Sequence, residues 1–318
     1  MTAALQADRP DSVTPGVADT ETFEQAVPRT LVHRSAISEV LLTGIRHSGG
    51  ARYRIGAQWP RSHSYYGVIA RRWHDPMVFA ESIRQAGLLL AHQALHIRMG
   101  SHFLTESLSF GITESGARLS RGPANVVLDV VLSHVERRRN VVSAFTYQVT
   151  AYREGERIGS GSTTARCVSP AVYSRLRGHR ASSVPSGYLP VALAPQAVGR
   201  SVDADVVLGA ATWDGARILR ADPDHPVLFD HPVDHIPGMV VMEAARQAAL
   251  VTLGLPAGLL LGCHAEFRSY IEFDPPCLVS VPPPQPGAAP HLTRPVEFVQ
   301  AGSVAATCTV TVHDGSGA

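Results

Sequence analysis

The chain carries one helical motif twice, and this repeat is the feature that most limits how it can fold. Residues 81–86 read ESIRQA and residues 243–248 read EAARQA, so the two glutamates lie 243 − 81 = 162 positions apart. The same offset aligns His63 with His225 and His102 with His264. An ungapped match of this length indicates an internal duplication. We therefore expect two similar structural units in one chain.

Bulk composition is compatible with two ordinary domains and narrows the range of partners. The chain has 318 residues, of which 45% are hydrophobic and 17% charged, and its formal net charge is +1. Such a balance gives no electrostatic reason to bind nucleic acid or an anionic membrane. The four cysteines are scattered, without the paired spacing of a zinc site or redox motif. We expect no metal and no cofactor.

Shifts in composition predict four segments. Residues 1–28 are polar and contain proline, which predicts a disordered N-terminal tail. Residues 29–174 form the predicted first domain, residues 175–201 a linker rich in Ser, Pro, Ala and Gly, and residues 202–318 a shorter second domain. The chain starts without a secretory signal pattern, and charged residues interrupt its apolar stretches. We therefore expect a cytoplasmic protein.

The segment around the first glutamate is the clearest helix of the first half. Asp75 can cap its first turn, and Pro76 suits the first helical position. Gly87 is expected to let another backbone approach closely. Apolar side chains recur at three- and four-residue spacing, at Phe79, Ile83, Ala86 and Leu90. The helix is therefore expected to be mostly buried.

Strand patterns surround this helix. Residues 35–42 and 53–59 are expected to form short strands, and residues 141–153 and 159–168 form a predicted hairpin. A second helix is predicted at residues 238–253. Periodicity alone thus indicates a duplicated α+β protein and no more.

Longer motifs give a resemblance to a known family. They are HR at 33–34 with EVLLT at 39–43, AQWPRSHSYY at 57–66, ESIRQAG at 81–87, and residues 231–247. Together they resemble the A-factor biosynthesis (AfsA) family. The resemblance implies a tandem double hotdog, a pseudo-dimer within one chain in which each half has an antiparallel sheet wrapped around one long central helix. It also implies an acyltransferase that joins a β-ketoacyl group from acyl carrier protein to a hydroxyl of dihydroxyacetone phosphate, a step toward a butyrolactone or furan signalling molecule.

One segment also resembles the active-site segment of hotdog dehydratases that act on acyl-carrier-protein thioesters. Residues 229–244 contain a histidine loop, then Pro-Gly at the helix start, then an acidic residue one and a half turns later. Both His231 and His235 remain candidates for the histidine of that pattern. In the dehydratases the catalytic pair is completed across a dimer interface. A fused pseudo-dimer can therefore combine Glu81 of one half with a loop histidine of the other.

Acyl transfer needs a base for the hydroxyl, a stabiliser for the oxyanion and a ligand for the phosphate. We expect Glu243 to be the base, because desolvation on an apolar helix should raise its pKa. Arg246, three residues later, can orient this carboxylate or bind phosphate, and Gln247 can add a hydrogen bond. The open helix end at Gly238 offers backbone amides to the thioester oxygen.

The first copy supplies a second set of candidates. Glu81 is the expected catalytic counterpart of the second-half glutamate, and Arg84 and Gln85 follow it at the same spacing. His63 is a further candidate for substrate binding. Whether one half or both are catalytic stays open.

Two alternatives remain at this stage. The chain can instead be a hotdog dehydratase or thioesterase that acts on an acyl thioester alone. It can also be a non-catalytic ligand-binding protein in which the helix glutamates only form ion pairs with arginines. The expected partners are acyl carrier protein and dihydroxyacetone phosphate, with further dimerisation possible.

Overall fold

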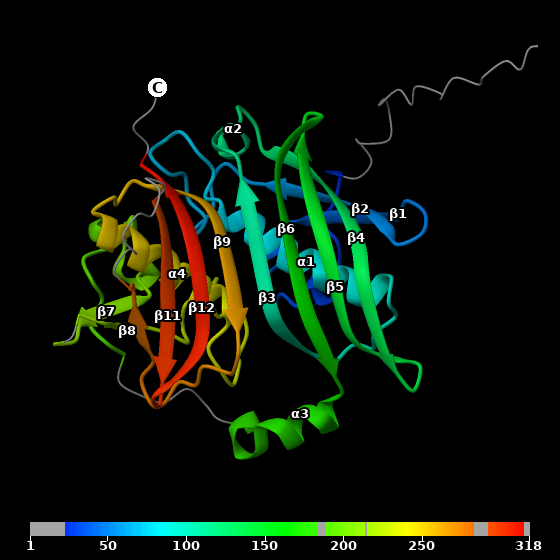
Figure 1. Cartoon of the computed structure of the whole chain (residues 1–318). Coiled ribbons are helices and arrows are strands. Elements are labelled where there is room, and N and C mark those ends of the chain that lie inside the picture. The colour runs from blue at the N-terminus through cyan, green and yellow to red at the C-terminus, as the bar shows by residue number, and fades with distance from the viewer. Residues whose placement is uncertain (1–22, 183–188, 214, 283–291, 315–318) are drawn as a thin grey trace, which may run out of the picture.

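One antiparallel sheet of twelve strands runs through the whole protein (Figure 1). The computed structural model describes residues 23–182, 189–213, 215–282 and 292–314. The strand order is β1-β2-β4-β5-β6-β3-β9-β12-β11-β10-β8-β7. The strands are β1 (Leu42–His47), β2 (Arg52–Trp59), β3 (His102–Ile112), β4 (Ala124–Arg138), β5 (Val141–Arg153), β6 (Glu156–Val168), β7 (Leu208–Ala211), β8 (Arg217–Leu219), β9 (Leu259–Phe267), β10 (Leu278–Ser280), β11 (Leu292–Gln300) and β12 (Ser303–His313).

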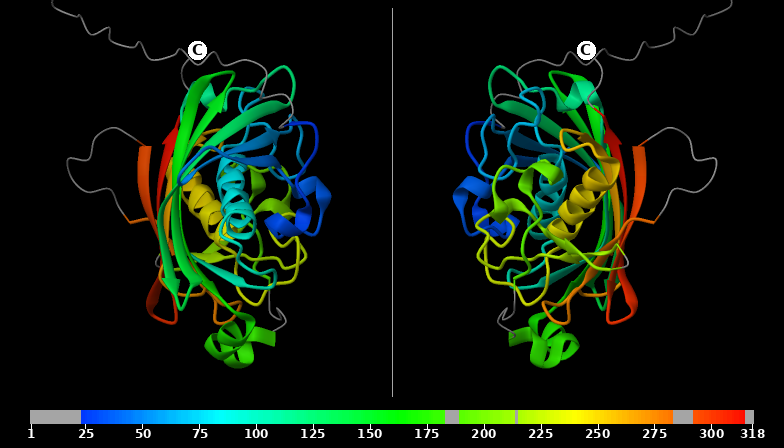
Figure 2. Two further views of the ribbon diagram at one scale, coloured as in Figure 1. Left: turned by 90° about the vertical axis from the view of Figure 1, so that its right-hand side faces the viewer. Right: turned by 90° about the vertical axis from the view of Figure 1, so that its left-hand side faces the viewer.

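The sheet consists of two halves joined edge to edge. β3 pairs antiparallel with β9, with Ser109 opposite His264, and the strands on either side of this seam follow the same order in both halves. The sheet curves around two central helices, α1 (Met77–Gln93) and α4 (Gly238–Leu253), which lie side by side in its concavity (Figure 2). The expected tandem double hotdog is confirmed. The second half is the shorter one, because β8 and β10 have three residues each.

Helix α1 is buried along almost its whole length. The carboxylate of Asp75 accepts a hydrogen bond from the backbone N–H of Met77 at 2.9 Å, so the predicted cap is confirmed. Helix α4 has the predicted bounds and ends at Gly254, whose φ of 66° is the left-handed conformation that glycine adopts easily. No described helix is long and apolar enough to cross a membrane.

Gly87 makes room for a side chain and not, as expected, for a backbone. A Cβ at this position would lie 2.4 Å from the hydroxyl oxygen of Tyr147. That hydroxyl donates a hydrogen bond of 2.7 Å to the carbonyl of Ile83. The buried tyrosine of β5 therefore crosses the helix at the one position that lacks a side chain.

Other local predictions met mixed outcomes. β5 has the predicted bounds, but residues 35–42 are not a strand, since they form a 3-10 turn at Ile37–Glu39 and enter β1 only at Leu42. The predicted boundary at residue 174 falls inside α3 (Pro170–Arg177), the helix at the bottom of Figure 1. Most of the predicted tail, residues 1–22, lies outside the described residues.

The remaining helical segments are short. They are α2 (Glu114–Ala117) and the 3-10 turns Arg29–Val32, Gly178–Ser182, Pro195–Val198 and Asp203–Asp205.

Candidate active site

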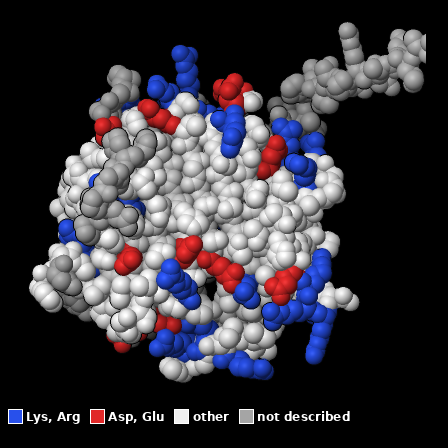
Figure 3. All heavy atoms as spheres, viewed as in Figure 1, with Lys and Arg blue, Asp and Glu red and all other residues white. Residues whose placement is uncertain are grey.

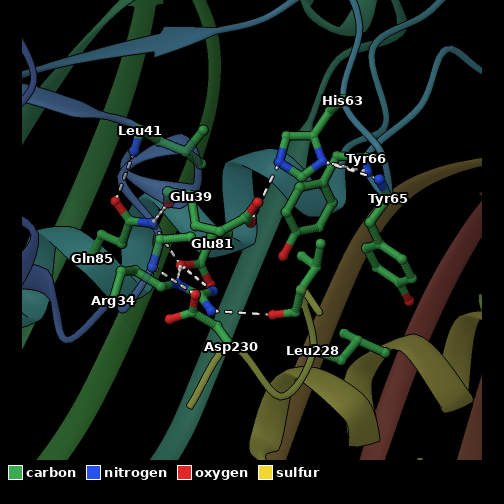
Figure 4. Close-up of polar contacts among 12 residues, drawn as sticks. Arg34, Glu39, Leu41, His63, Tyr65, Tyr66, Glu81, Gln85, Leu228 and Asp230 are labelled. Carbon is green, nitrogen blue, oxygen red and sulfur yellow. Dashed lines mark hydrogen bonds and ion pairs between the residues drawn. The ribbon is translucent and has the colours of Figure 1, made fainter. Parts of the chain in front are cut away.

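The carboxylate of Glu81 is buried in α1 and held by cations. Arg84, one helical turn later, donates to it from Nε and Nη2, both at 2.8 Å. Arg34 reaches the same carboxylate from the segment before β1, with Nη2 2.7 Å from Oε1. Gln85 adds a hydrogen bond of 2.7 Å from its amide nitrogen. Figure 4 shows Arg34 and Gln85 converging on Glu81.

Helix α4 repeats this cluster around Glu243. Arg246 donates from Nη2 to Oε1 at 2.8 Å, and Gln247 donates to the same oxygen at 2.6 Å. Arg200 takes the place of the distant arginine, with Nε 3.1 Å from Oε1. The duplication therefore extends to the individual hydrogen bonds of the buried charges.

The glutamines also tie each helix to the chain segment that precedes the sheet. Gln85 accepts from the backbone N–H of Leu41 at 3.0 Å and donates to the carbonyl of Glu39 at 2.7 Å. Gln247 makes the equivalent bonds with the backbone of Val207 and Asp205. Both amides are thus fully used in structural contacts.

His63 has a structural environment that His225 shares. Its Nδ1 accepts the backbone N–H groups of Tyr65 and Tyr66, both at 3.1 Å, so the proton lies on Nε2, which is 3.4 Å from the carboxylate of Glu39 (Figure 4). His225 accepts two backbone amides in the same way. His63 does not reach the cavity described below.

The two distant arginines cross between the halves. Arg34 of the first half donates from Nη1 to the carbonyl of Val227 at 3.2 Å, and Arg200 donates from Nη1 to the carbonyl of Tyr65 at 2.7 Å. Val227 and Tyr65 are themselves related by the repeat offset of 162, since 227 − 65 = 162. In each half, therefore, the arginine of the buried ion pair also donates a hydrogen bond to a backbone carbonyl of the other half.

The expectation that burial raises the pKa of the helix glutamates is wrong. Burial alone would raise the pKa of Glu81, but the guanidinium groups of Arg34 and Arg84 and the bond from Gln85 lower it to about 2. The pKa of Glu243 is also lowered, because two arginines and a glutamine outweigh its desolvation. Both carboxylates are therefore ionised at neutral pH and are poor proton acceptors there.

The buried cluster around Glu81 and the buried cluster around Glu243 form two half-sites, which differ at the N-terminal ends of their helices. At α1, Asp75 accepts from Met77 and from Arg246 Nη1 at 3.1 Å, so its carboxylate fills the space between this helix end and the second-half cluster. The repeat places Pro237, which carries no carboxylate, at the equivalent position before α4. The cluster around Glu243 is consequently sealed, with the side chains of Glu243 and Arg246 0% and 3% exposed.

At the other half-site the structure has a cavity of about 420 Å³ between the two halves. Arg34 and Arg84 from the first half face it, together with Gly238 at the start of α4 from the second half. The first amides of α4 lack intrahelical acceptors and point to this end of the helix. Apolar side chains form most of the wall, among them Leu104, Leu108, Leu228, Phe229, Ile236, Met239, Met242 and Phe267.

His231 and His235 both line this cavity. Nδ1 of His231 lies 3.5 Å from the carboxylate of Asp230, and Nδ1 of His235 lies 2.7 Å from the carboxylate of Asp234. Burial lowers the pKa of His231 below 6.5, and the nearby Arg84 and Arg34 lower it further, against the bond to Asp230. His231 is therefore a neutral imidazole at pH 7, able to accept a proton.

The structure thus brings together only part of the predicted set. Arg84, His231, His235 and Gly238 meet at the cavity, with Glu81 directly behind Arg84. The other predicted residues lie away from its wall, namely Glu243, Arg246, Gln247, Gln85 and His63. Among the described residues, no group of His, Cys, Asp or Glu side chains could hold a metal ion.

Sequence reasoning missed Arg34 and Arg200 as members of the site. A second repeat contains them: Arg-Ser is followed by an acidic residue and Val at 34–40 and again at 200–206. Its offset is 200 − 34 = 166, four more than the offset of the helices. An ungapped alignment at the helix offset therefore does not pair Arg34 with Arg200. A gapped self-comparison would have found both arginines.

Fused halves that share one sheet, with a cavity at the junction of their helices, define a double-hotdog protein. A family model, the A-factor biosynthesis hotdog domain, matches residues 17–169 and 184–313. The chain belongs to this family.

Proteins named 2-oxo-3-(phosphooxy)propyl 3-oxoalkanoate synthase are similar over most of their length. The one from Streptomyces virginiae is 43% identical over 257 residues, which are 81% of this chain and 87% of that protein. The one from Streptomyces coelicolor is 35% identical over 283 residues, 87% of this chain and 88% of that protein. Among solved structures, an acyl-ACP thioesterase from Bacteroides thetaiotaomicron aligns with a TM-score of 0.49 and 10% identity, over 82% of this chain and 98% of that one.

Proposed function

We propose that the protein is a cytoplasmic acyltransferase that esterifies dihydroxyacetone phosphate with a β-ketoacyl group delivered by acyl carrier protein. The names of its relatives describe this ester, in which a 3-oxoalkanoate is joined to a 2-oxo-3-(phosphooxy)propyl group. The observation that carries the proposal is the cavity between the halves. It combines Arg34 and Arg84, the neutral His231 and an open helix end with an apolar wall.

The reaction requires one bond to form and one to break. The free hydroxyl oxygen of the triose phosphate attacks the thioester carbonyl, and a C–O bond forms. The carbon–sulfur bond then breaks, and the carrier thiol leaves with a proton. The base must accept the hydroxyl proton and return it to the thiolate, so no oxidant or reductant is involved.

We assign the base to His231. Its imidazole is neutral, lies beside the carboxylate of Asp230 and faces the cavity. Asp230 also accepts the backbone N–H groups of Ser35 and Ala36, at 2.5 and 3.0 Å, which anchors the histidine loop to the first half. The catalytic loop of one half is thereby fixed against the other half.

The oxyanion would be stabilised by two groups. The open amides at Gly238 and the guanidinium of Arg84 line the same cavity. Glu81 keeps this guanidinium in place through two hydrogen bonds, while the side chain of Arg84 remains 25% exposed. We therefore propose Glu81 as a positioning residue. The sealed cluster of Glu243 and Arg246 then serves as the structural counterpart and not as a second catalytic site.

Carrier protein needs a surface at the mouth of the cavity. Arg166 and Arg268 line the cavity and have side chains 49% and 58% exposed. Basic side chains also gather along the lower edge of the face in Figure 3, around α3 and the β4–β5 turn. An acidic carrier protein would be attracted to this edge.

The activity test is direct. Purified protein, a β-ketoacyl carrier protein and dihydroxyacetone phosphate should give the phosphorylated ester, detected by mass spectrometry. Release of free acid without an acceptor would identify a thioesterase instead, and loss of water from the acyl chain a dehydratase. Absence of ester across several chain lengths, from folded protein, would reject the proposal.

The assignment of the base has its own test. His231→Asn should lower kcat by about 100-fold or more, the usual contribution of a general base. His264→Gln is the control, because His264 lies on the far side of β9 from this site and its side chain is 54% exposed. If His235→Asn lowers kcat and His231→Asn does not, the roles of the two histidines are exchanged.

A further inference from the structure

A second cavity, of about 220 Å³, adjoins the first. Arg84, His231 and His235 line both cavities and so stand at their junction. The smaller cavity extends from there between α1 and strands β3, β5 and β6, past Gly87 and His102. Its position makes it a separate compartment that opens on the proposed base.

The two cavities differ in their acidic side chains, while arginine lines both, with Arg34, Arg84, Arg166 and Arg268 at the larger and Arg84 at the smaller. Glu106 and Asp230 line the larger one, whereas no Asp or Glu is among the described residues that line the smaller one. The smaller cavity has hydroxyl groups from Ser101, Thr105 and Tyr173 in its wall. Its nitrogen-bearing side chains are His33, Arg84, His102, His231 and His235. Such a wall offers donors and positive charge but no carboxylate.

Two of these side chains are fixed by the segment that joins the halves. His102 stacks on Tyr173 of α3, with ring centroids 3.7 Å apart and planes 2° from parallel. The hydroxyl of Tyr173 donates to Asp234 at 2.7 Å, and Arg177 donates to the same carboxylate at 2.9 Å. His235 is bonded to it as well. The negative charge of Asp234 is therefore balanced by Arg177, and its hydrogen bonds fix the side chains of Tyr173 and His235.

His33 is positioned by a chain of hydrogen bonds. Nδ1 of His92 donates to the carbonyl of Ile97 at 2.8 Å, so its Nε2 accepts from Nε2 of His33 at 2.9 Å. Burial lowers the pKa of His33, the neighbouring His92, Arg84 and other basic side chains lower it further, and the resulting pKa is about 4. His33 is therefore uncharged at neutral pH, and the formal positive charge in this wall belongs to Arg84, whose partner Glu81 is not among the described lining residues.

We propose that the smaller cavity binds the phosphate group of the acceptor substrate, with Arg84 of α1 and His102 of β3 as ligands. A phosphate monoester carries up to two negative charges and only accepts hydrogen bonds, which matches a wall of guanidinium, imidazole and hydroxyl donors. The β-ketoacyl chain then lies in the larger apolar cavity. The two substrates meet between Arg84 and His231. This inference rests on the proposed function for the identity of the acceptor.

Phosphate binding can be measured without any acyl donor, so the test is separate from that of the activity. Inorganic phosphate and dihydroxyacetone phosphate are titrated into the full chain by calorimetry, with sulfate-free buffer. His102→Gln should weaken the binding of dihydroxyacetone phosphate about tenfold or more, the effect of losing a bond to a charged group. His264→Gln, the repeat counterpart of His102 on β9, should leave binding within twofold.

The outcomes separate the two proposals. If the protein binds phosphate, His102→Gln weakens this binding and no ester is formed, the phosphate site in the smaller cavity is supported and the proposed activity is rejected. If the protein forms the ester and His102→Gln leaves KM for dihydroxyacetone phosphate unchanged, the smaller cavity is not the phosphate site, while the proposed activity stands. A change in acyl chain preference in His102→Gln, with phosphate binding unaltered, would assign the cavity to the acyl chain. His102→Asn, with the shorter amide, repeats the test if the first variant does not fold.

Discussion

Substitution of Glu81 by Gln tests whether this glutamate is an ionised anchor or a base. Its pKa is lowered from 4.5 to about 2, mainly by Arg34 and Arg84 acting against burial. A carboxyl group whose pKa is lower in the folded state stabilises the fold above pH 4.5, and this stabilisation is lost as the pH falls toward 2. Integrated over the whole range, the shift corresponds to about 3 kcal/mol of unfolding free energy.

Most of this loss falls in an accessible pH range. With an unfolded pKa of 4.5 and a folded pKa of about 2, wild type should lose about 0.8 kcal/mol between pH 7 and pH 4 through this group, and about 2 kcal/mol by pH 3. Glu81→Gln cannot lose this contribution. The difference in unfolding free energy between wild type and variant should therefore shrink by these amounts, measured by urea unfolding at each pH.

The same variant separates anchor from base in the activity assay. If Glu81 only positions Arg84, kcat of the variant should fall moderately. The acidic limb of the pH profile of kcat, which reflects protonation of His231, should keep its midpoint below pH 6.5. A stability difference that does not change with pH would refute the lowered pKa. Loss of the acid limb in Glu81→Gln would show that the glutamate itself accepts the proton.

Three further outcomes follow from the half-sites. Asp75→Ala should lower the unfolding free energy by about 3 kcal/mol, since it leaves Arg246 short of a buried partner, and a urea midpoint that stays unchanged would contradict this. Gly238→Ala should reduce activity more than stability, because a Cβ would lie 3.0 Å from the ring of Phe267 at the cavity wall; equal kcat by the ester assay would contradict it. Arg268→Glu should raise KM for the carrier-bound donor but not for a small thioester analogue, whereas an equal rise for both would exclude a docking role.

The duplicated helices were predictable because their signals are local. Capping at Asp75, apolar spacing along 79–90 and the bounds of 238–253 depend on neighbouring residues, and the structure confirms them. The family motifs then supplied the sheet that periodicity alone left undefined. The predicted strand at 35–42 failed for the opposite reason, since the segment is shaped by distant bonds to Gln85 and Asp230.

The electrostatics of the site could not be predicted from single segments. Burial of Glu81 was foreseeable, but the sign of its pKa shift depends on Arg34, which lies 47 positions earlier in the chain. The difference between the half-sites likewise depends on Asp75 and Arg246, whose contact spans 171 positions. Residue types were visible in the sequence, whereas their partners across the halves were not.

The exchanged arginine contacts have a consequence for how the two halves can change. Arg34 bonds to Val227 and Arg200 bonds to Tyr65, so the two halves exchange equivalent hydrogen bonds, as the two subunits of a symmetric homodimer do. In a homodimer every substitution appears at both symmetric positions, and both sites gain or lose function together. Covalent fusion removes that restriction. One position can acquire the carboxylate of Asp75 and bond to Arg246 of the other half, while its counterpart keeps Pro237 beside the cavity proposed for the substrates.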